Sequence, residues 1–95
     1  MHIINRKRII QAAELHKDCA TALSGWYQTM KAASFTNFSE LKASFNSVDK
    51  VEHLYVFDIG GNKLRLVAVI HFNTGKVFIH EILTHSEYDK GKWKE

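Results

Sequence analysis

Residues 64–72 alternate between two kinds of side chain, and this pattern constrains the fold more than any other part of the chain. The even positions, from Leu64 to Phe72, are all apolar, whereas the odd positions include Arg65 and His71. Successive side chains of a β-strand point to opposite faces of a sheet. The alternation therefore predicts a strand with one face buried and the other partly polar.

Two further segments have strand character, and turn residues separate all three. Leu54–Ile59 and Lys76–Leu83 are rich in apolar residues that favour strands. Gly60-Gly61, which adopt positive φ readily, and Asn73-Thr74-Gly75 lie between these segments and the central strand. We therefore expect a small antiparallel sheet, a β-meander, in the second half of the chain. His2-Ile3-Ile4 is a candidate for a short first strand.

The first half of the chain has helical periodicity instead. We expect a helix over about residues 6–17 with Asn5 as its N-cap, and a short helical turn over Phe38–Phe45 with Asn37 as its N-cap. A second helix should begin at Asp18. Its apolar stripe is spaced for the core at steps of four, three and four: Cys19, Leu23, Trp26 and Met30. Helices followed by consecutive antiparallel strands predict an α+β fold, with two to three helices on one face of the sheet.

Length and composition limit the class of protein. A chain of 95 residues can bury one core, so we expect a single domain over residues 1–95. No apolar run approaches the ~20 residues of a membrane span, and the apolar residues at the N-terminus precede the basic ones. We therefore expect a cytoplasmic protein without a membrane partner. The single cysteine, Cys19, excludes an internal disulfide, and the net charge of +3 slightly favours a polyanionic partner.

The turn at Asn73-Thr74-Gly75 decides how the faces of the last two strands match. If it pairs Phe72 with Lys76, then Phe78, His80 and Ile82 join the apolar face that the helices cover. The odd positions of the last strand, which include Glu81, then join Arg65 on the other face. His85 follows the same parity.

The turn at Gly60-Gly61 decides the match on the other side of the central strand. A two-residue turn would pair Ile59 with Asn62 and set Asp58 opposite Lys63. The face that the helices leave uncovered would then be a partly polar surface with five such side chains: Asp58, Lys63, Arg65, Glu81 and His85.

The segment after the last expected strand combines a helix-start signal with reactive side chains. Thr84 and Glu87 have the spacing of a capping box, so a short helical turn should begin there. On this turn His85, Tyr88 and Asp89 stand at positions i, i+3 and i+4 and share one side. The turn begins where the strand ends, which should bring these groups near Arg65, and Lys90 adds a cation.

These side chains suit RNA cleavage without a metal. The 2′-hydroxyl of RNA can attack the adjacent phosphate when one group removes its proton, another protonates the leaving 5′-oxygen, and a cation stabilises the added charge. Histidine exchanges protons near neutral pH, arginine matches phosphate geometry, and tyrosine can orient a phosphate or stack on a base. An exposed helix cap at His85, and an ion pair between Arg65 and Glu81, are the structural alternatives. No nucleotide-cofactor or zinc motif is present.

Three stretches of the chain together resemble the HigB toxins of toxin–antitoxin modules, which belong to the RelE/ParE superfamily. They are Met1-His2-Ile3-Ile4, Gly61-Asn62-Lys63-Leu64-Arg65-Leu66-Val67 and Thr84-His85-Ser86-Glu87-Tyr88-Asp89-Lys90. The resemblance extends from Met1 to about Lys90. It implies a RelE-like fold with the active site on the sheet face opposite the helices.

The same resemblance implies a function and its partners. It indicates an endoribonuclease that cleaves mRNA on the ribosome without a metal or cofactor, and so inhibits translation. A helix-turn-helix antitoxin of the HigA type would neutralise the toxin, and the pair would bind operator DNA through the antitoxin. A ParE-like toxin that binds gyrase, or a noncatalytic RNA- or protein-binding module on the same fold, remain as alternatives.

Carried over by position, the resemblance also assigns residues. Arg65 matches the strand arginine that stabilises the transition-state phosphate, and His85 and Tyr88 match the C-terminal catalytic pair. The supporting or RNA-binding residues are expected to be Lys63, Glu81, Asp89 and Lys90. The assignment of general acid and general base among His85, Tyr88 and Glu81 stays open. Trp93 lies beyond the motif, where it could stack on a base or pack on the rim of the sheet.

Overall fold

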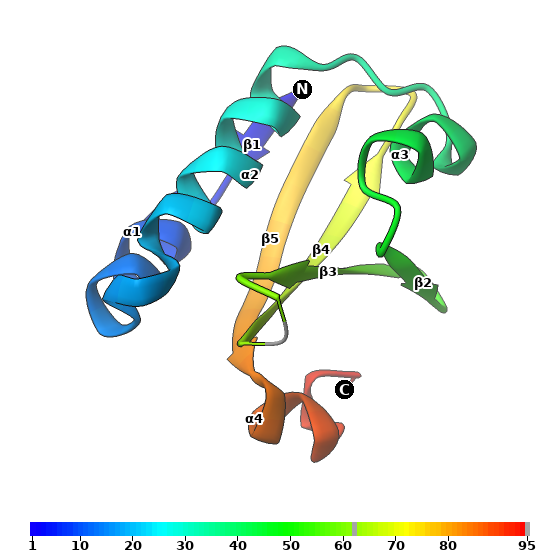
Figure 1. Cartoon of the computed structure of the whole chain (residues 1–95). Helices are drawn as coiled ribbons and strands as arrows, with labels where there is room; N and C mark the ends of the chain where they lie inside the picture. The colour runs from blue at the N-terminus through cyan, green and yellow to red at the C-terminus, as the bar shows by residue number, and fades with distance from the viewer. Residues whose placement is uncertain (62, 95) are drawn as a thin grey trace.

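The computed structural model describes residues 1–61 and 63–94 and has helices packed on a five-stranded sheet (Figure 1). The strands are β1 (His2–Ile4), β2 (Asp49–Val51), β3 (Leu54–Ile59), β4 (Leu64–His71) and β5 (Lys76–Thr84). The helices are α1 (Lys7–Leu15), α2 (Ala20–Ala32), α3 (Phe38–Ser44) and α4 (His85–Asp89), with 3-10 turns at Lys17–Cys19 and Lys92–Lys94. None of the described helices is long and apolar enough to cross a membrane.

The sheet has the order β1-β5-β4-β3-β2 and is mixed. The meander β3–β4–β5 is antiparallel as predicted, and the α+β class is confirmed. The expectation of an entirely antiparallel sheet is wrong, because β1 pairs with β5 in parallel, with Ile3 opposite Val77. A meander leaves β5 at an edge, and β1 pairs with backbone groups that would otherwise be exposed there. The sequence pattern also gave no indication of β2.

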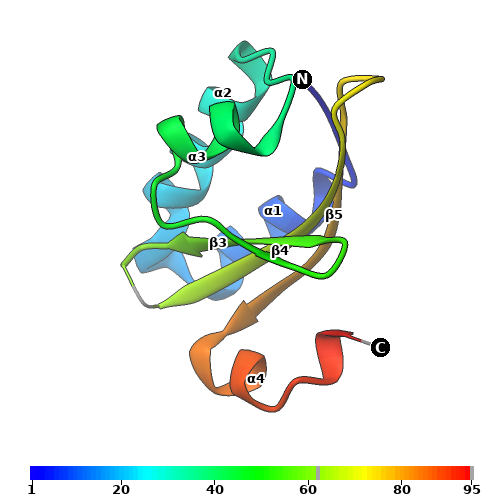
Figure 2. The same ribbon diagram turned by 90° about the vertical axis from the view of Figure 1, so that its right-hand side faces the viewer.

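The main core lies between one face of the sheet and helices α1, α2 and α3 (Figure 2). The predicted stripe faces this core, and all four of its members are buried: Cys19 in the 3-10 turn before α2, and Leu23, Trp26 and Met30 on α2. The Trp26 ring meets Phe57 of β3 edge-on, with the centroids 5.3 Å apart. Aromatic pairs in this geometry add to the free energy gained by burying their surface. One face of the sheet is therefore fixed by packing, which determines what the other face can carry.

The predicted helix ends are correct for α3 and wrong for α1 and α2. Asn37 Oδ1 accepts a hydrogen bond from the Glu40 N–H at 2.9 Å, as the capping spacing predicts. Asn5 does not cap α1. Instead it takes a positive φ of 73° and its side-chain amide donates to the Ile79 carbonyl. Asp18 does not cap α2, because it lies inside the 3-10 turn and its carboxylate pairs with Lys63 at 2.8 Å.

The β3–β4 hairpin has a longer loop than predicted. Ile59 pairs with Leu64, so the predicted two-residue turn is wrong; Asn62, the partner predicted for Ile59, lies outside the described residues. A Cβ at Gly60 would come within 3.1 Å of Cys19 Sγ, so the loop packs closely on the α2 end of the core. Asp58 consequently faces Arg65 rather than Lys63. The register differs from the predicted one by two residues. Because side chains alternate between the faces with a period of two, each residue of β3 and β4 still lies on its predicted face.

The β4–β5 register changes along the ladder. Near the turn Lys76 pairs with His71, not with Phe72, and the buried residues of β5 there are Val77 and Ile79. The prediction that Phe78 and His80 join the helix-covered face is therefore wrong. A β-bulge between Val67 and Ala68 then shifts the register by one residue. Beyond the bulge the predicted faces hold: Ile82 packs against the main core, and Glu81 pairs with Val67.

Candidate active site

The sheet face away from α1, α2 and α3 carries a second, smaller core. Leu54, Val56 and Val67 are buried there together with Trp93. Figure 2 shows α4 and the C-terminal segment on the side of the sheet away from α2 and α3. The prediction of an uncovered, partly polar face is correct for Asp58 and Arg65, but the C-terminal segment covers much of it. The candidate site therefore lies where this cover meets the ends of β3, β4 and β5.

Helix α4 begins as its sequence predicts. Thr84 Oγ1 accepts a hydrogen bond from the Glu87 N–H at 3.2 Å, and Glu87 Oε1 accepts one from the Thr84 N–H at 2.9 Å. The Thr84 N–H, together with the Thr84 hydroxyl, holds the pKa of Glu87 below its usual range. A helix of this length is not stable in isolation, so the reciprocal hydrogen bonds determine where α4 begins and thereby the positions of His85 and Tyr88.

The capping box predicts a pH-dependent difference between the wild type and Glu87→Gln. The lowered pKa of Glu87 means that the ionised carboxylate stabilises the fold. That contribution is present above the ordinary glutamate pKa of about 4.3 and is lost as the pH falls further. Thermal denaturation should show Glu87→Gln melting roughly 2–4 °C below the wild type at pH 7, with the gap closing below pH ~4. An unchanged gap at low pH would contradict a role for the ionised carboxylate.

Arg65 is held in place from two sides. Its side chain is only 11% exposed, its Nε lies 3.1 Å from Asp58 Oδ1, and its guanidinium lies over the Tyr88 ring at 5.6 Å. The alternative that Arg65 pairs with Glu81 is wrong, since Glu81 pairs with Arg8 at 3.4 Å. A guanidinium fixed in this way is oriented before any substrate arrives, which is what stabilisation of a developing charge requires.

Tyr88 lies between the helix and the sheet. Its ring stacks on Trp93, with the centroids 4.8 Å apart and the planes 13° apart. Burial is the main cause that raises the pKa of Tyr88, followed by the Asp49 carboxylate, while Arg65 acts in the opposite direction. A phenol with a raised pKa stays protonated at neutral pH, so Tyr88 presents an O–H donor and not a phenolate.

His85 and Asp89 lie on the exposed side of α4. Their side chains are 57% and 62% exposed, and His85 Nε2 lies 3.6 Å from Asp89 Oδ2. The spacing of four residues brings them together as predicted. The pair is an ion pair only while the imidazole is protonated. Tyr88, expected on the same side, packs inward against Arg65 and Trp93 instead. The imidazole is therefore accessible, and the phenol is partly enclosed.

The supporting residues separate into two groups. Lys63 is not brought to the site, because it leaves the β3–β4 loop towards the helices and binds Asp18 at 2.8 Å. Glu81 and Lys90 do come together. They line a cavity of about 330 Å³ between β5 and the C-terminal segment, and the other lining residues are Leu83, Glu87, Lys92 and Trp93. Lys90 and Lys92 give this cavity two cations, but Glu81 and Glu87 line it as well, and none of Arg65, His85 and Tyr88 does.

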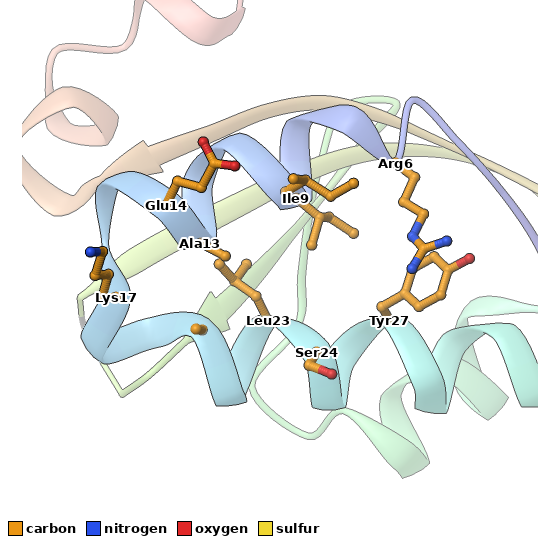
Figure 3. A pocket seen from close by; sticks show the side chains of 10 residues that line it. Arg6, Ile9, Ala13, Glu14, Lys17, Leu23, Ser24 and Tyr27 are labelled. Carbon is orange, nitrogen blue, oxygen red and sulfur yellow. The ribbon is translucent and has the colours of Figure 1, made fainter.

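A second hollow, of about 380 Å³, lies between α1 and α2 (Figure 3). Its walls include Ile9, Ala13 and Leu23, and Arg6 extends over the Tyr27 ring at 4.7 Å. None of the residues predicted for catalysis lines it. A mainly apolar groove is a poor match for a polyanion, so its size does not make it the candidate site.

Two residues of the site were not assigned from the sequence. Asp58 was placed on the correct face but given the wrong partner, and the correct hairpin register would have shown that it faces Arg65. For Trp93 the sequence left two roles open, and packing on the sheet is the one observed, because Trp93 is buried with Leu54, Val56 and Val67. Its burial against Tyr88 is visible only in three dimensions.

A small sheet with helices on one face, Arg65 and Tyr88 in contact on the other, and His85 exposed on the same short helix as Tyr88 is the arrangement expected of a RelE-like toxin. The family model described as "RelE-like toxic component of a toxin-antitoxin system" matches residues 19–91. The chain belongs to this family, the HigB toxins. Membership in a toxin–antitoxin family implies an antitoxin as a partner.

Similar proteins that match nearly the whole chain support the same family. The chain is 40% identical over 92 residues to the mRNA interferase toxin HigB of Escherichia coli K12, which covers 94% of this chain and 88% of the relative. It has the same identity and coverage to the mRNA interferase HigB of Shigella flexneri. A 34% match over 93 residues, covering 95% of this chain and 90% of the relative, is to the mRNA interferase HigB of Escherichia coli O6:H1.

Proposed function

We propose that the protein is a toxin that cleaves mRNA, with Arg65, His85 and Tyr88 as its catalytic residues and no metal in the chemical step. The printed names of the relatives, all mRNA interferases, support the activity. The observation that carries the site is the contact between Arg65 of β4 and Tyr88 of α4, at 5.6 Å. It joins two segments that are distant in sequence at the point where His85 is exposed.

In the proposed reaction the 2′-hydroxyl oxygen attacks the adjacent phosphorus while the bond to the 5′-oxygen breaks. His85 takes part in the proton transfer, because its exposed imidazole can reach an RNA strand. Tyr88, whose phenol is protonated at neutral pH, donates a hydrogen bond to a phosphate oxygen. Arg65 stabilises the negative charge of the pentacoordinate phosphorus. The products are a 2′,3′-cyclic phosphate and a free 5′-hydroxyl, with the proton transferred from one oxygen to the other.

We propose that the substrate is mRNA positioned by the ribosome. The net charge is only +3, and the cavity lysines Lys90 and Lys92 are accompanied there by Glu81 and Glu87. Such a surface binds a free polyanion weakly, because affinity for nucleic acid grows with the number of phosphates neutralised. A ribosome that holds the strand in place would remove the need for tight binding. The cytoplasm, where ribosomes meet mRNA, is then the place of action.

We propose further that the antitoxin is a helix-turn-helix protein of the HigA type, and that the pair binds its own operator DNA through the antitoxin. Membership in the HigB family supports this proposal. A helix-turn-helix protein encoded beside the toxin gene, whose co-expression restores growth, would support the pairing.

Induction of the wild type in growing cells tests the function. We expect new mRNA 5′ ends inside coding regions and a rapid stop in protein synthesis, with DNA synthesis continuing at first. A gyrase-binding toxin on the same fold would give the opposite result: intact transcripts and blocked replication. That outcome would contradict the proposed nuclease function. If the protein affected neither transcripts nor replication, a noncatalytic RNA- or protein-binding module would be favoured.

A further inference from the structure

The turn Lys92–Lys94 places Trp93 against the candidate site, beyond the residues 19–91 that the family model matches. Trp93 is 5% exposed and makes two contacts with one residue: its ring stacks on Tyr88, and its Nε1 donates to the Tyr88 carbonyl at 2.8 Å. These contacts constrain both the ring and the backbone of Tyr88. A nearly buried indole that is already stacked in this way is poorly placed to stack on an RNA base.

We propose that Trp93 is a positioning residue that sets the place of Tyr88, and through α4 that of His85, for the cleavage reaction; this inference rests on the nuclease function proposed above. Helix α4 has only five residues, too few for stability without tertiary contacts. The capping box at Thr84 fixes its first turn. Trp93 holds its last turn, because the indole N–H donates to the Tyr88 carbonyl at the helix end, in addition to the Gly91 N–H at 3.1 Å.

The sheet in turn holds Trp93. His80 Nε2 donates to the Trp93 carbonyl at 3.1 Å. The ladder pairs Ala68 with Ile79 and Val67 with Glu81, so His80 is the extra residue at the bulge. Bulges often re-aim a side chain beside a functional site, and here the bulge residue anchors the C-terminal turn. The bulge in β5 and the C-terminal turn therefore act together in holding Trp93.

The contacts continue from Trp93 to the other side of the site. Trp93 stacks on Tyr88, Arg65 lies over the Tyr88 ring, and Asp58 binds Arg65. Loss of the indole would leave Tyr88 free to move away from Arg65. A displacement of about 1 Å in a catalytic group can cost roughly 100-fold in rate.

Steady-state cleavage of ribosome-bound mRNA by Trp93→Ala and Trp93→Phe tests the proposal. We expect Trp93→Ala to lower kcat roughly 10- to 100-fold with KM within about twofold of the wild type. Trp93→Phe keeps an aromatic ring against Tyr88 and should recover most of kcat. Trp26→Phe, which changes a buried tryptophan in the other core, is the matched control and should leave kcat unchanged.

Three kinetic results would overturn the proposal. An unchanged kcat in folded Trp93→Ala would show that Tyr88 needs no support from the indole. A raised KM with normal kcat would show that Trp93 binds RNA directly. If Trp93→Ala does not fold, Trp93→Phe and Trp93→Leu decide: equal kcat in both would contradict an aromatic contact, and a higher kcat in Trp93→Phe would support it.

A readout independent of activity separates this inference from the nuclease proposal. The stacked indole should shift the NMR signals of the Tyr88 ring protons to high field, and Trp93→Phe should shift them less. If the wild type does not cleave mRNA, but the Tyr88 signals change when Trp93 is replaced, the positioning is retained and the nuclease function is rejected. An unchanged Tyr88 signal on loss of the indole would reject the positioning whatever the activity.

Discussion

Arg65→Ala is expected to slow mRNA cleavage by about 100- to 1,000-fold, the usual cost of removing a preorganised group that stabilises developing charge. The guanidinium is fixed by Asp58 at 3.1 Å and by the Tyr88 ring at 5.6 Å, so its orientation is set before the RNA binds. Arg65→Lys keeps the charge but not the planar fork, and should recover only a small part of the rate. Single-turnover cleavage of mRNA on purified ribosomes measures all three rates.

Arg6→Ala is the matched control for Arg65→Ala. Arg6 is also an arginine over a tyrosine ring, at 4.7 Å from Tyr27, but it lies on the helix side of the sheet. Its replacement removes the same charge and the same kind of contact, and should change the cleavage rate by less than about threefold. Equal loss in both variants would mean that net charge, not the placement of Arg65, governs activity.

His85→Gln is expected to lower the cleavage rate by about 100-fold or more, since proton transfer in the transition state typically contributes that much. The side chain is 57% exposed, so its replacement should change the free energy of unfolding by no more than about 0.5 kcal/mol. Chemical denaturation and single-turnover cleavage on the same preparation measure both quantities.

His53→Gln provides the comparison for His85→Gln. His53 is likewise exposed and lies in the turn between β2 and β3, two strands that carry none of the proposed catalytic residues, and its replacement should leave the cleavage rate unchanged. A large fall in unfolding free energy for His85→Gln would mean that the imidazole has a structural role. A cleavage rate like that of the wild type would remove His85 from the proposed chemistry.

The faces of the sheet were predictable although both hairpin registers were partly wrong. In β3–β4 the error was two residues, which leaves the side-chain parity intact, so Asp58 and Arg65 stayed on one face. In β4–β5 the one-residue error near the turn was cancelled by the bulge before Ile82. Strong alternation in β4 predicts faces reliably. It does not predict pairings, because loop packing such as that of Gly60 on Cys19 decides the length of a turn.

Local signals predicted the start of α4, and long-range contacts supplied the rest of the site. The capping box at Thr84 and Glu87 is a property of adjacent residues and was visible in the sequence. The contact of Tyr88 with Trp93 and the separation of Lys63 from the site depend on how distant elements meet. The parallel pairing of β1 with β5 was missed for the same reason.

The chemistry of the cut ends tests the proposed reaction most directly. Ribosomes carrying a defined mRNA are incubated with the wild-type toxin, and the fragment ends are identified by mass spectrometry and end-specific ligation. Attack by the 2′-hydroxyl predicts a 2′,3′-cyclic phosphate on the upstream fragment and a 5′-hydroxyl on the downstream one, both formed about 100- to 1,000-fold more slowly with Arg65→Ala. Fragments that end in a 3′-hydroxyl and a 5′-phosphate would contradict the reaction assigned to Arg65, His85 and Tyr88.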